Sequence, residues 1–280
     1  MSESLFIRDC YLQTSWLPLP DLSRQVGLGD VLQILPGRVA VLASLANVHL
    51  AQAAQLSPEL PLLAQDFRLQ SGVTNKSWQR YNGDDDTPGE IGYCRAELEF
   101  GWPGSYLFQC QRVNAQYLLN WQQLRDDFTL KLTQMHYQFR QVCVVTAVAR
   151  AEDWELSIAA QAQAHQVFSS ELSVRTAPDI LSGPKRQLEA SQGMAVHQSS
   201  QHLAAHFIQA KCLILSELAD DKFLNQIVEA QVAGNAVQRA NWLHADKMNL
   251  FRNAELNLTS CKDFFSWRNL TLDDVEVLIK

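Results

Sequence analysis

The sequence lacks an apolar run long enough for a membrane-spanning helix, which needs about 20 consecutive apolar residues. Its start, MSESLFIRDCYLQTSW, also lacks the charged beginning and apolar centre of a secretory signal peptide. The six cysteines include no CxxC pair, which argues against a structural zinc site. Because Cys110, Cys143 and Cys212 stand in apolar, strand-like runs, we expect buried, reduced thiols there. These absences predict a soluble, cytoplasmic and reduced chain.

Basic charge is scarce as well, since 30 acidic residues outnumber 23 lysines and arginines and leave a net charge of −7. The basic stripe typical of nucleic-acid-binding proteins is missing, and electrostatic docking onto anionic lipid is not favoured. With 47% hydrophobic residues among 280, the chain can bury a full core. No stretch rich in glycine and serine divides it into independent domains.

Catalytic signatures are also absent, because the chain contains no GxSxG, Walker loop or GxGxxG. His202 and His206 have the spacing of a zinc helix but lack its glutamate, and their surroundings resemble a strand, so surface or half-buried histidines are favoured. The acidic residues 84–86 and Glu90 lack the glycine and the terminal glutamate of an EF-hand loop, which favours a solvated turn over a calcium site. We therefore expect a protein that is not an enzyme and holds no metal.

What the sequence does contain is two predicted β-hairpins, of which the clearer spans Arg140–Phe168. Its first arm is the valine-rich run Val142–Val148, and its turn is the charged cluster 150–153. In the return arm, Leu156, Ile158, Ala160 and Ala162 alternate with mostly polar residues, which gives one dry and one wet face. The arms, of about 9 and 11 residues, have the length of a strand that crosses a bilayer, although soluble sandwiches share this pattern.

The second predicted hairpin joins Arg95–Phe100 to Tyr106–Val113 through the turn 102–105. In its first arm, Ala96, Leu98 and Phe100 face one side, and charged residues face the other. Leu107 lies in the apolar return arm.

The remaining segments favour a mixture of strands and helices. Tyr117–Leu132 places Tyr117, Leu118, Trp121, Leu124, Phe128 and Leu132 on one face of a helix, which we expect to pack on a sheet. Other expected elements are an extended segment at 11–24, a strand at Arg38–Leu45, a helix at 51–65, two strands within Met194–Leu218 and a helix at Asp221–Trp242. Because strands and helices come in blocks rather than in alternation, we predict an α+β fold. It has a central, twisted, mostly antiparallel β-sheet with surrounding helices and a short C-terminal tail.

This order of elements resembles the gasdermin family of pore-forming proteins, in particular the short bacterial type. The similarity rests on RQVCVVTAVARAEDWELSIAAQAQA, on the helix before it, on SWLPLPDLSRQVGLGDVLQIL and on GMAVHQSSQHLAAHFIQAKCLIL. Together these segments cover about two-thirds of the chain.

The resemblance implies an autoinhibited cytoplasmic monomer that a protease activates by removing a short C-terminal peptide. The released core then oligomerises, and two hairpins from each copy form a large β-barrel pore in the cell inner membrane. Such a pore causes cell death, which in bacteria serves as antiviral defence against phage. The implied partners are an activating protease, membrane lipids after cleavage and further copies of the chain, without nucleic acid.

The resemblance also assigns roles along the chain. Residues 1–245 form the pore-forming core, and residues 246–280 form the cleavage region and the autoinhibitory peptide. The candidate membrane-inserting residues are Ala96, Leu98, Phe100, Leu107, Val142, Val144, Val148, Leu156, Ile158 and Ala160. The cleavage candidates are Lys247, Leu250 and Arg252, and the residues expected to dock the tail on the core are Phe264, Phe265, Trp267, Leu270 and Leu272. Cys10 is the candidate for a palmitoyl group, and no other cofactor is implied.

Two other interpretations stay open. A soluble α+β binding or immunity-like protein would keep both hairpins within one sheet and would form no pore. In that case the tail would be a permanent part of the core. An enzyme with an unrecognised site is the least favoured alternative.

Overall fold

The structure is a computed structural model, and it describes residues 3–82, 90–134, 142–170, 187–200, 202–215 and 265–280. Helices and antiparallel β-sheets are combined in an α+β fold, as predicted. The described helices are α1 (Ser4–Thr14), α2 (Trp121–Gln134), α7 (Leu272–Ile279) and the 3-10 helix η1 (Ala64–Phe67). None of these helices is long and apolar enough to cross a membrane.

The largest sheet has eight strands, and we call it the large sheet. Its central pair is β10 with β15; β2 and β9 add to β10, and β1 and β16 add to β15. Its strands are β1 (Leu17–Pro18), β2 (Val31–Leu35), β3 (Arg38–Ala43), β4 (Leu60–Leu62), β9 (Arg112–Tyr117), β10 (Val142–Glu152), β15 (Ala205–Leu215) and β16 (Phe265–Asn269).

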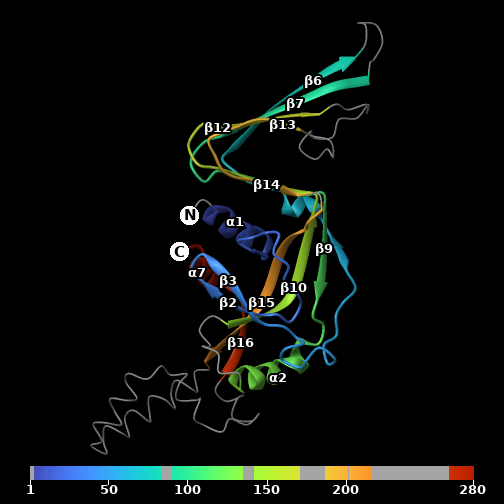
Figure 1. The fold of residues 1–280 in the computed structure, drawn as a ribbon, viewed down its shortest axis with the longest axis vertical. Helices are drawn as coiled ribbons and strands as arrows, with labels where there is room; N and C mark the ends of the chain where they lie inside the picture. Colours follow the sequence, from blue (N-terminus) through green and yellow to red (C-terminus); the bar gives the residue numbers. More distant parts are fainter. Residues whose placement is uncertain (1–2, 83–89, 135–141, 171–186, 201, 216–264) are drawn as a thin grey trace, which may run out of the picture.

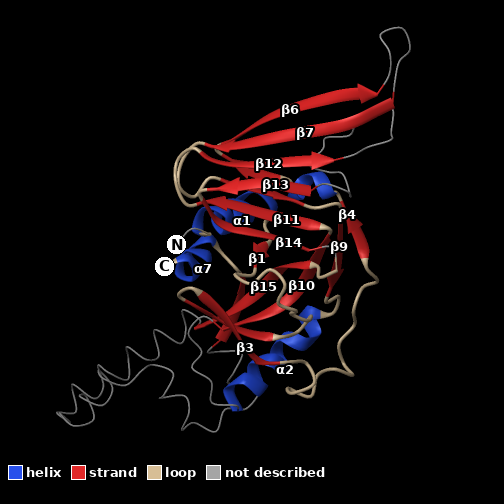
Figure 2. Cartoon of the chain, turned by 45° about the horizontal axis from the view of Figure 1, so that its top comes forward, coloured by secondary structure: helices blue, strands red, loops and turns tan. Residues whose placement is uncertain are grey.

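Two further sheets of four strands each lie beyond the large sheet (Figure 2). The middle sheet consists of β5 (Leu69–Ser71), β8 (Tyr106–Gln109), β11 (Trp154–Ala159) and β14 (Met194–Ser200). The end sheet consists of β6 (Val73–Asn82), β7 (Glu90–Phe100), β12 (Ala164–Ser170) and β13 (Gln187–Gln192). The end sheet lies at one end of the molecule, where β6 and β7 extend farthest (Figure 1).

The three sheets are connected by two long, bent hairpins. In the first, β4, β5 and β6 lead from the large sheet to the end sheet, and β7, β8 and β9 return. In the second, β10, β11 and β12 lead out, and β13, β14 and β15 return. The hairpins lie side by side, because β9, β8 and β7 pair with β10, β11 and β12. We call residues 60–117 and 142–215 together the four-strand ribbon.

The ribbon bends where backbone geometry interrupts its ladders. Between β10 and β11, Asp153 adopts a left-handed conformation with φ of 49°. Between β5 and β6, Gly72 has φ of 65°, and a Cβ atom there would lie 2.7 Å from the Trp102 ring. Only glycine fits such a position without strain. These corners let each hairpin pass from one sheet to the next.

Both hairpins predicted from the sequence are therefore wrong in their turns. Within the described residues, β10 pairs with β15, β2 and β9, whereas β11 pairs with β14 and β8. Likewise, β7 pairs with β6 and β12 rather than with β8. The clusters 150–153 and 102–105 are corners between sheets rather than reversals. Charge, proline and glycine interrupt a strand in either case, so the pattern alone does not distinguish the two outcomes.

Of the other elements predicted from the sequence, some are confirmed and one is wrong. Helix α2 is confirmed, with Trp121, Leu124, Phe128 and Leu132 buried, although Tyr117 ends β9 instead. The strand near Arg38 and the two strands within Met194–Leu218 are also confirmed. The expected helix at 51–65 is wrong, because that region contains turns, β4 and the start of η1. The expected helix Asp221–Trp242 lies outside the described residues.

Helix α1 was not predicted, and it replaces the start of the expected extended segment. Phe6, Ile7 and Cys10 recur at spacings of three and four, and all three are buried. The helix ends at Ser15, whose left-handed conformation directs its N–H to the carbonyl of Tyr11 at 2.8 Å.

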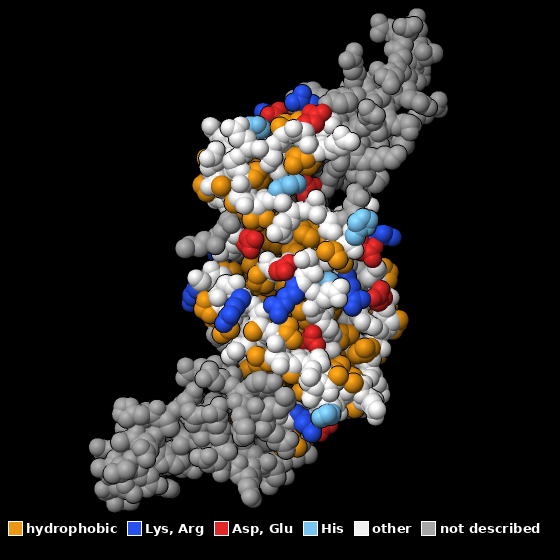
Figure 3. All heavy atoms as spheres, viewed as in Figure 1, with side chains coloured by type: hydrophobic (Ala, Val, Ile, Leu, Met, Phe, Trp, Pro, Cys, Tyr) orange, Lys and Arg blue, Asp and Glu red, His pale blue; other side chains and the backbone are white. Residues whose placement is uncertain are grey.

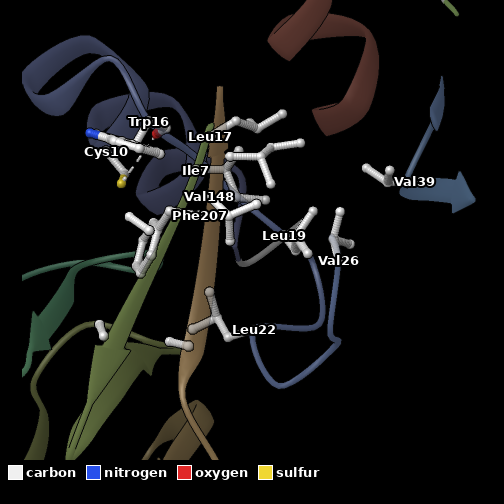
Figure 4. Packing of buried hydrophobic residues seen from close by; sticks show 14 of the residues in the cluster. Ile7, Cys10, Trp16, Leu17, Leu19, Leu22, Val26, Val39, Val148 and Phe207 are labelled. Atoms are coloured by element: carbon white, nitrogen blue, oxygen red, sulfur yellow. Dashed lines mark hydrogen bonds between the residues drawn. The ribbon is translucent and has the colours of Figure 1, made fainter. Parts of the chain in front are cut away.

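The large sheet is covered on both faces. One face carries a cluster that includes residues of α1 and α7, and the other carries a cluster with α2. Val142 and Val144 belong to the α2 cluster, while Cys143 and Val145 belong to the other. This explains why β10 is apolar at nearly every position. Figure 4 shows the packing of α1 residues against β1 and Phe207.

Candidate functional site

The C-terminal segment, residues 265–280, packs at the edge of the large sheet and on the first helix. Strand β16 pairs antiparallel with β15, and α7 packs on α1 and near β2 (Figure 1). The Ser4 hydroxyl donates to the carbonyl of Ile279 at 3.3 Å, and the Tyr11 hydroxyl donates to that of Leu270 at 2.5 Å. The N–H of Gly37 donates to the carbonyl of Leu278 at 2.7 Å. The segment therefore contacts both the first helix and the sheet.

A charged cluster fixes the connection between β16 and α7. The guanidinium of Arg268 donates two hydrogen bonds to the Asp274 carboxylate, at 2.5 and 2.7 Å. Thr271 caps α7, and its N–H donates to Asp274 at 2.8 Å. Burial would raise the pKa of Asp274, but the bonds from Arg268 and Thr271 outweigh it, so the pKa lies below its usual value. Asp274 is therefore held as a carboxylate.

Apolar side chains anchor the same segment. Phe265, Leu270, Val275 and Leu278 are each at most 6% exposed. Trp267 is half-buried; its indole N–H donates to the Thr129 hydroxyl at 2.8 Å, and its ring meets Trp121 edge-on at 5.0 Å.

Of the tail residues singled out from the sequence, Phe265 and Leu270 are buried in the core. Trp267 and Leu272 are half-buried against it. Phe264 and the cleavage candidates Lys247, Leu250 and Arg252 lie outside the described residues.

Strand β7 of the end sheet has one apolar and one charged face. Ala96, Leu98 and Phe100 of β7 are fully buried and cluster with Phe168 of β12. Glu99 on the opposite face forms an ion pair with Lys76 at 3.5 Å. Within the described residues, the outer strands β6 and β13 each pair on one side only. Among the described strands, the outer sides of β6 and β13 have no paired neighbouring strand, which is the arrangement of a sheet edge.

The sequence-predicted hairpin residues are distributed over all three sheets. Val142, Val144 and Val148 lie in the large sheet, Leu107, Leu156 and Ile158 in the middle sheet, and Ala96, Leu98 and Phe100 in the end sheet. Ala160 is exposed in the turn after β11. Every residue of β11 is buried, so its predicted wet face is wrong. The predicted return arm, which reaches Phe168, combines β11 and most of β12 in one strand, and the sequence pattern does not predict β6 or β13.

A polar cluster connects the middle sheet to the end sheet. Nδ1 of His197 on β14 lies 3.1 Å from the Ser157 hydroxyl, 3.1 Å from the Gln166 amide and 3.6 Å from the Glu155 carboxylate. Glu155, Ser157 and Gln166 are each at most 2% exposed. Because Gln166 belongs to β12 and the other groups to the middle sheet, the cluster joins the two sheets across a corner.

The cysteines differ from expectation. Cys143 and Cys212 form a disulfide, so the expected reduced thiols are wrong for this pair. Cys10 and Cys110 are free. Cys10 is fully buried, its thiol donates to the carbonyl of Trp16 at 3.6 Å, and burial raises its pKa to about 12. A palmitoyl group on Cys10 therefore requires α1 to leave its site first.

The two histidines considered for zinc lie in different surroundings. His202 is exposed before β15, whereas His206 is 5% exposed within β15. Across the described ranges, no group of three or more histidine, cysteine, aspartate or glutamate side chains is arranged to hold a metal. The acidic residues 84–86 lie outside those ranges.

A scan of the chain against protein-family models finds no match, and neither does a search of curated proteins. Function must therefore be inferred from the fold and the contacts described above.

Proposed function

We propose that this protein is an autoinhibited pore-forming protein of the gasdermin type, which a protease activates by removing its C-terminal peptide. The four-strand ribbon carries the proposal, since it ends in an antiparallel end sheet at one end of the molecule (Figure 1). The membrane-crossing strands are then those of the end sheet, built from both hairpins. The disulfide-bearing strands β10 and β15 stay outside the bilayer.

The topology of the end sheet suits assembly of several copies. Its strand order is β13-β12-β7-β6, so the outer strands run in opposite directions. Strand β6 of one copy can therefore pair antiparallel with β13 of the next, and a ring of copies leaves no edge. Such closure satisfies every backbone hydrogen bond, which is what a lipid environment requires.

The polarity of β7 and its nearest partners fits the same assembly, although Gln166 lies opposite Leu98 on the same face. Ala96, Leu98 and Phe168 would face lipid, while Lys76 and Glu99 would face water. On the face seen in Figure 3, acidic, basic and apolar side chains of the described residues are interspersed. This mixture supports an apolar rather than an electrostatic attraction to the membrane.

The C-terminal segment is the proposed inhibitor. Each of Phe265, Leu270, Val275 and Leu278 contributes about 1.5–3 kcal/mol by burial, an upper-range value for the docked state. The covalent connection keeps the segment at a high effective concentration, and a cut before it converts docking into bimolecular binding. The cut belongs between residues 216 and 264, with Lys247, Leu250 and Arg252 as candidates. The released core then moves from the cytoplasm to the inner membrane, where the pore kills the cell as antiviral defence.

The deciding experiment is dye release from liposomes, with a protease site engineered near residue 250. We expect release only after the cut, because the intact chain keeps its segment docked. Leu98→Glu should abolish release, since it places a charge on the apolar face of β7, whereas the polar-face change Glu97→Gln should not. The absence of release after a confirmed cut, in several lipid mixtures, would favour a soluble binding protein instead.

A further inference from the structure

The disulfide between Cys143 and Cys212 lies on the face of the large sheet that the C-terminal segment covers. Both cysteines belong to the apolar cluster that also contains Leu270, Val275 and Leu278 of that segment. Their neighbours along the strands, such as Val144, belong to the cluster on the opposite face. The two sulfur atoms therefore point toward α7 rather than toward α2.

The segment lies directly over the bond. Cys212 stands opposite Cys143 on one side and opposite Arg268 of β16 on the other. Its Sγ lies 4.0 Å from Oδ2 of Asp274, the carboxylate that Arg268 binds. Both cysteines are at most 2% exposed. A reducing agent can reach the sulfur atoms only when the structure around them opens.

The disulfide joins the first and last strands of the second hairpin. Cys143 lies near the start of β10, and Cys212 lies near the end of β15, 69 residues later. The loop that it closes contains all of β11, β12, β13 and β14. The disulfide is therefore a covalent connection at the base of the second hairpin.

We propose that the C-terminal segment shields this disulfide, so that release of the segment makes the bond reducible and opens the base of the second hairpin. The reductant is a low-molecular-weight thiol. Its thiolate attacks one sulfur, forms a mixed disulfide and expels the other cysteine as a thiolate, which takes up a proton. A second thiol resolves the mixed disulfide, giving two cysteine thiols and one oxidised reductant.

This inference goes beyond pore formation and can fail independently of it, because its readout is thiol chemistry rather than leakage. It adds an order of events, in which the cut comes first and reduction follows. In the uncut chain, the second hairpin loses its covalent base much more slowly under reducing conditions.

The test measures the rate of reduction of the full-length chain by dithiothreitol. Samples are alkylated over time and digested with trypsin, which yields QVCVVTAVAR and CLILSELADDK as the two reporter peptides. We expect the cut chain, freed of its segment, to be reduced about tenfold faster or more than the intact chain, because opening of the segment limits access.

Two variants make the test independent of cutting. Arg268→Ala removes both bonds to Asp274 and should accelerate reduction in the uncut chain. Arg112→Ala is the matched control, since it breaks a surface ion pair with Glu152 at 2.8 Å, away from the segment. Equal rates in the intact, cut and Arg268→Ala chains would overturn the proposal. So would full alkylation of both peptides before any reductant is added.

Discussion

His206 is a buried histidine whose protonation is coupled to folding. It lies in β15 opposite Arg150, and its backbone bonds to Leu19 and Leu22 hold it in place. Burial, followed by the charge of Arg150, lowers the pKa of His206 below 6.5, although hydrogen bonds at Leu22 and Ala204 oppose the shift. The folded protein therefore keeps this imidazole neutral at pH values where the unfolded chain protonates it.

This shift predicts a loss of stability in acid. The unfolded state binds more protons below pH 6.5, so the free energy of unfolding falls as the pH drops through and below that value. Urea unfolding at about pH 7.5 and about pH 5 should show a smaller acid loss in His206→Gln than in the parent. The control is His202→Gln, which changes an exposed histidine of the same region and should keep the parent's pH dependence of stability. An unchanged slope in His206→Gln would contradict the argument.

At single residues, the sequence predicts burial but not the specific partner. Burial of Cys143 and Cys212 could be predicted, because each stands in an apolar run. Their pairing could not, since it depends on the register between strands 69 residues apart. Likewise, the apolar character of Phe265 and Leu270 predicted docking, whereas the bond of Arg268 to Asp274 depends on the turn between β16 and α7.

At the scale of elements, the C-terminal segment depends on a half-exposed arginine and a buried carboxylate. Asp274→Asn keeps the side-chain shape but removes the charge, which should cost about 1–3 kcal/mol. The pKa of Asp274 lies below 3.8, so its contribution is present above that value and is lost as the pH falls through the lowered pKa.

Hydrogen exchange measures this effect locally. Amides of residues 265–280 should exchange faster in Asp274→Asn than in the parent at neutral pH, while those of α2 should change little. The exposed neighbour gives the control, because Asp273→Asn leaves the Arg268 bonds in place. Equal protection of the segment in both variants would show that the ion pair contributes little to docking.

The sequence pattern predicts only some of the elements. The apolar stripe predicts α2 and the run of apolar, β-branched residues predicts β10, whereas α1, β6 and β13 are not predicted and the expected helix at 51–65 is wrong. The direction that the chain takes after β10 does not follow from the pattern, because Asp153 bends the strand into the middle sheet instead of reversing it. The alternation in β11 predicts a solvent-facing side that does not exist, because its polar residues Glu155 and Ser157 are buried in the polar cluster around His197.

At the scale of the whole molecule, the ribbon joins segments that the sequence keeps far apart. His165 of β12 lies directly opposite Glu99 of β7. Residues opposite each other on antiparallel strands are close enough for a disulfide, whereas diagonal neighbours about 7–8 Å apart are not. The pair Glu99→Cys with His165→Cys should therefore crosslink on mild oxidation.

The control pair Glu97→Cys with His165→Cys is shifted by two residues and should crosslink much less. Peptide mapping by mass spectrometry separates these bonds from those of the native cysteines. Efficient crosslinking of the control pair, or none of the matched pair, would contradict the strand order of the end sheet.

Contact between the two ends of the chain constrains how the protein is made. The bond from Ser4 to Ile279 spans 275 residues, and α1 packs on α7. Translation adds about 5–20 residues per second, so α1 waits roughly 14–55 s for its partner helix to be synthesised. During that interval the apolar side chains of Phe6, Ile7 and Cys10 have no α7 to pack against. The part of α1 that α7 covers therefore stays uncovered until α7 leaves the ribosome.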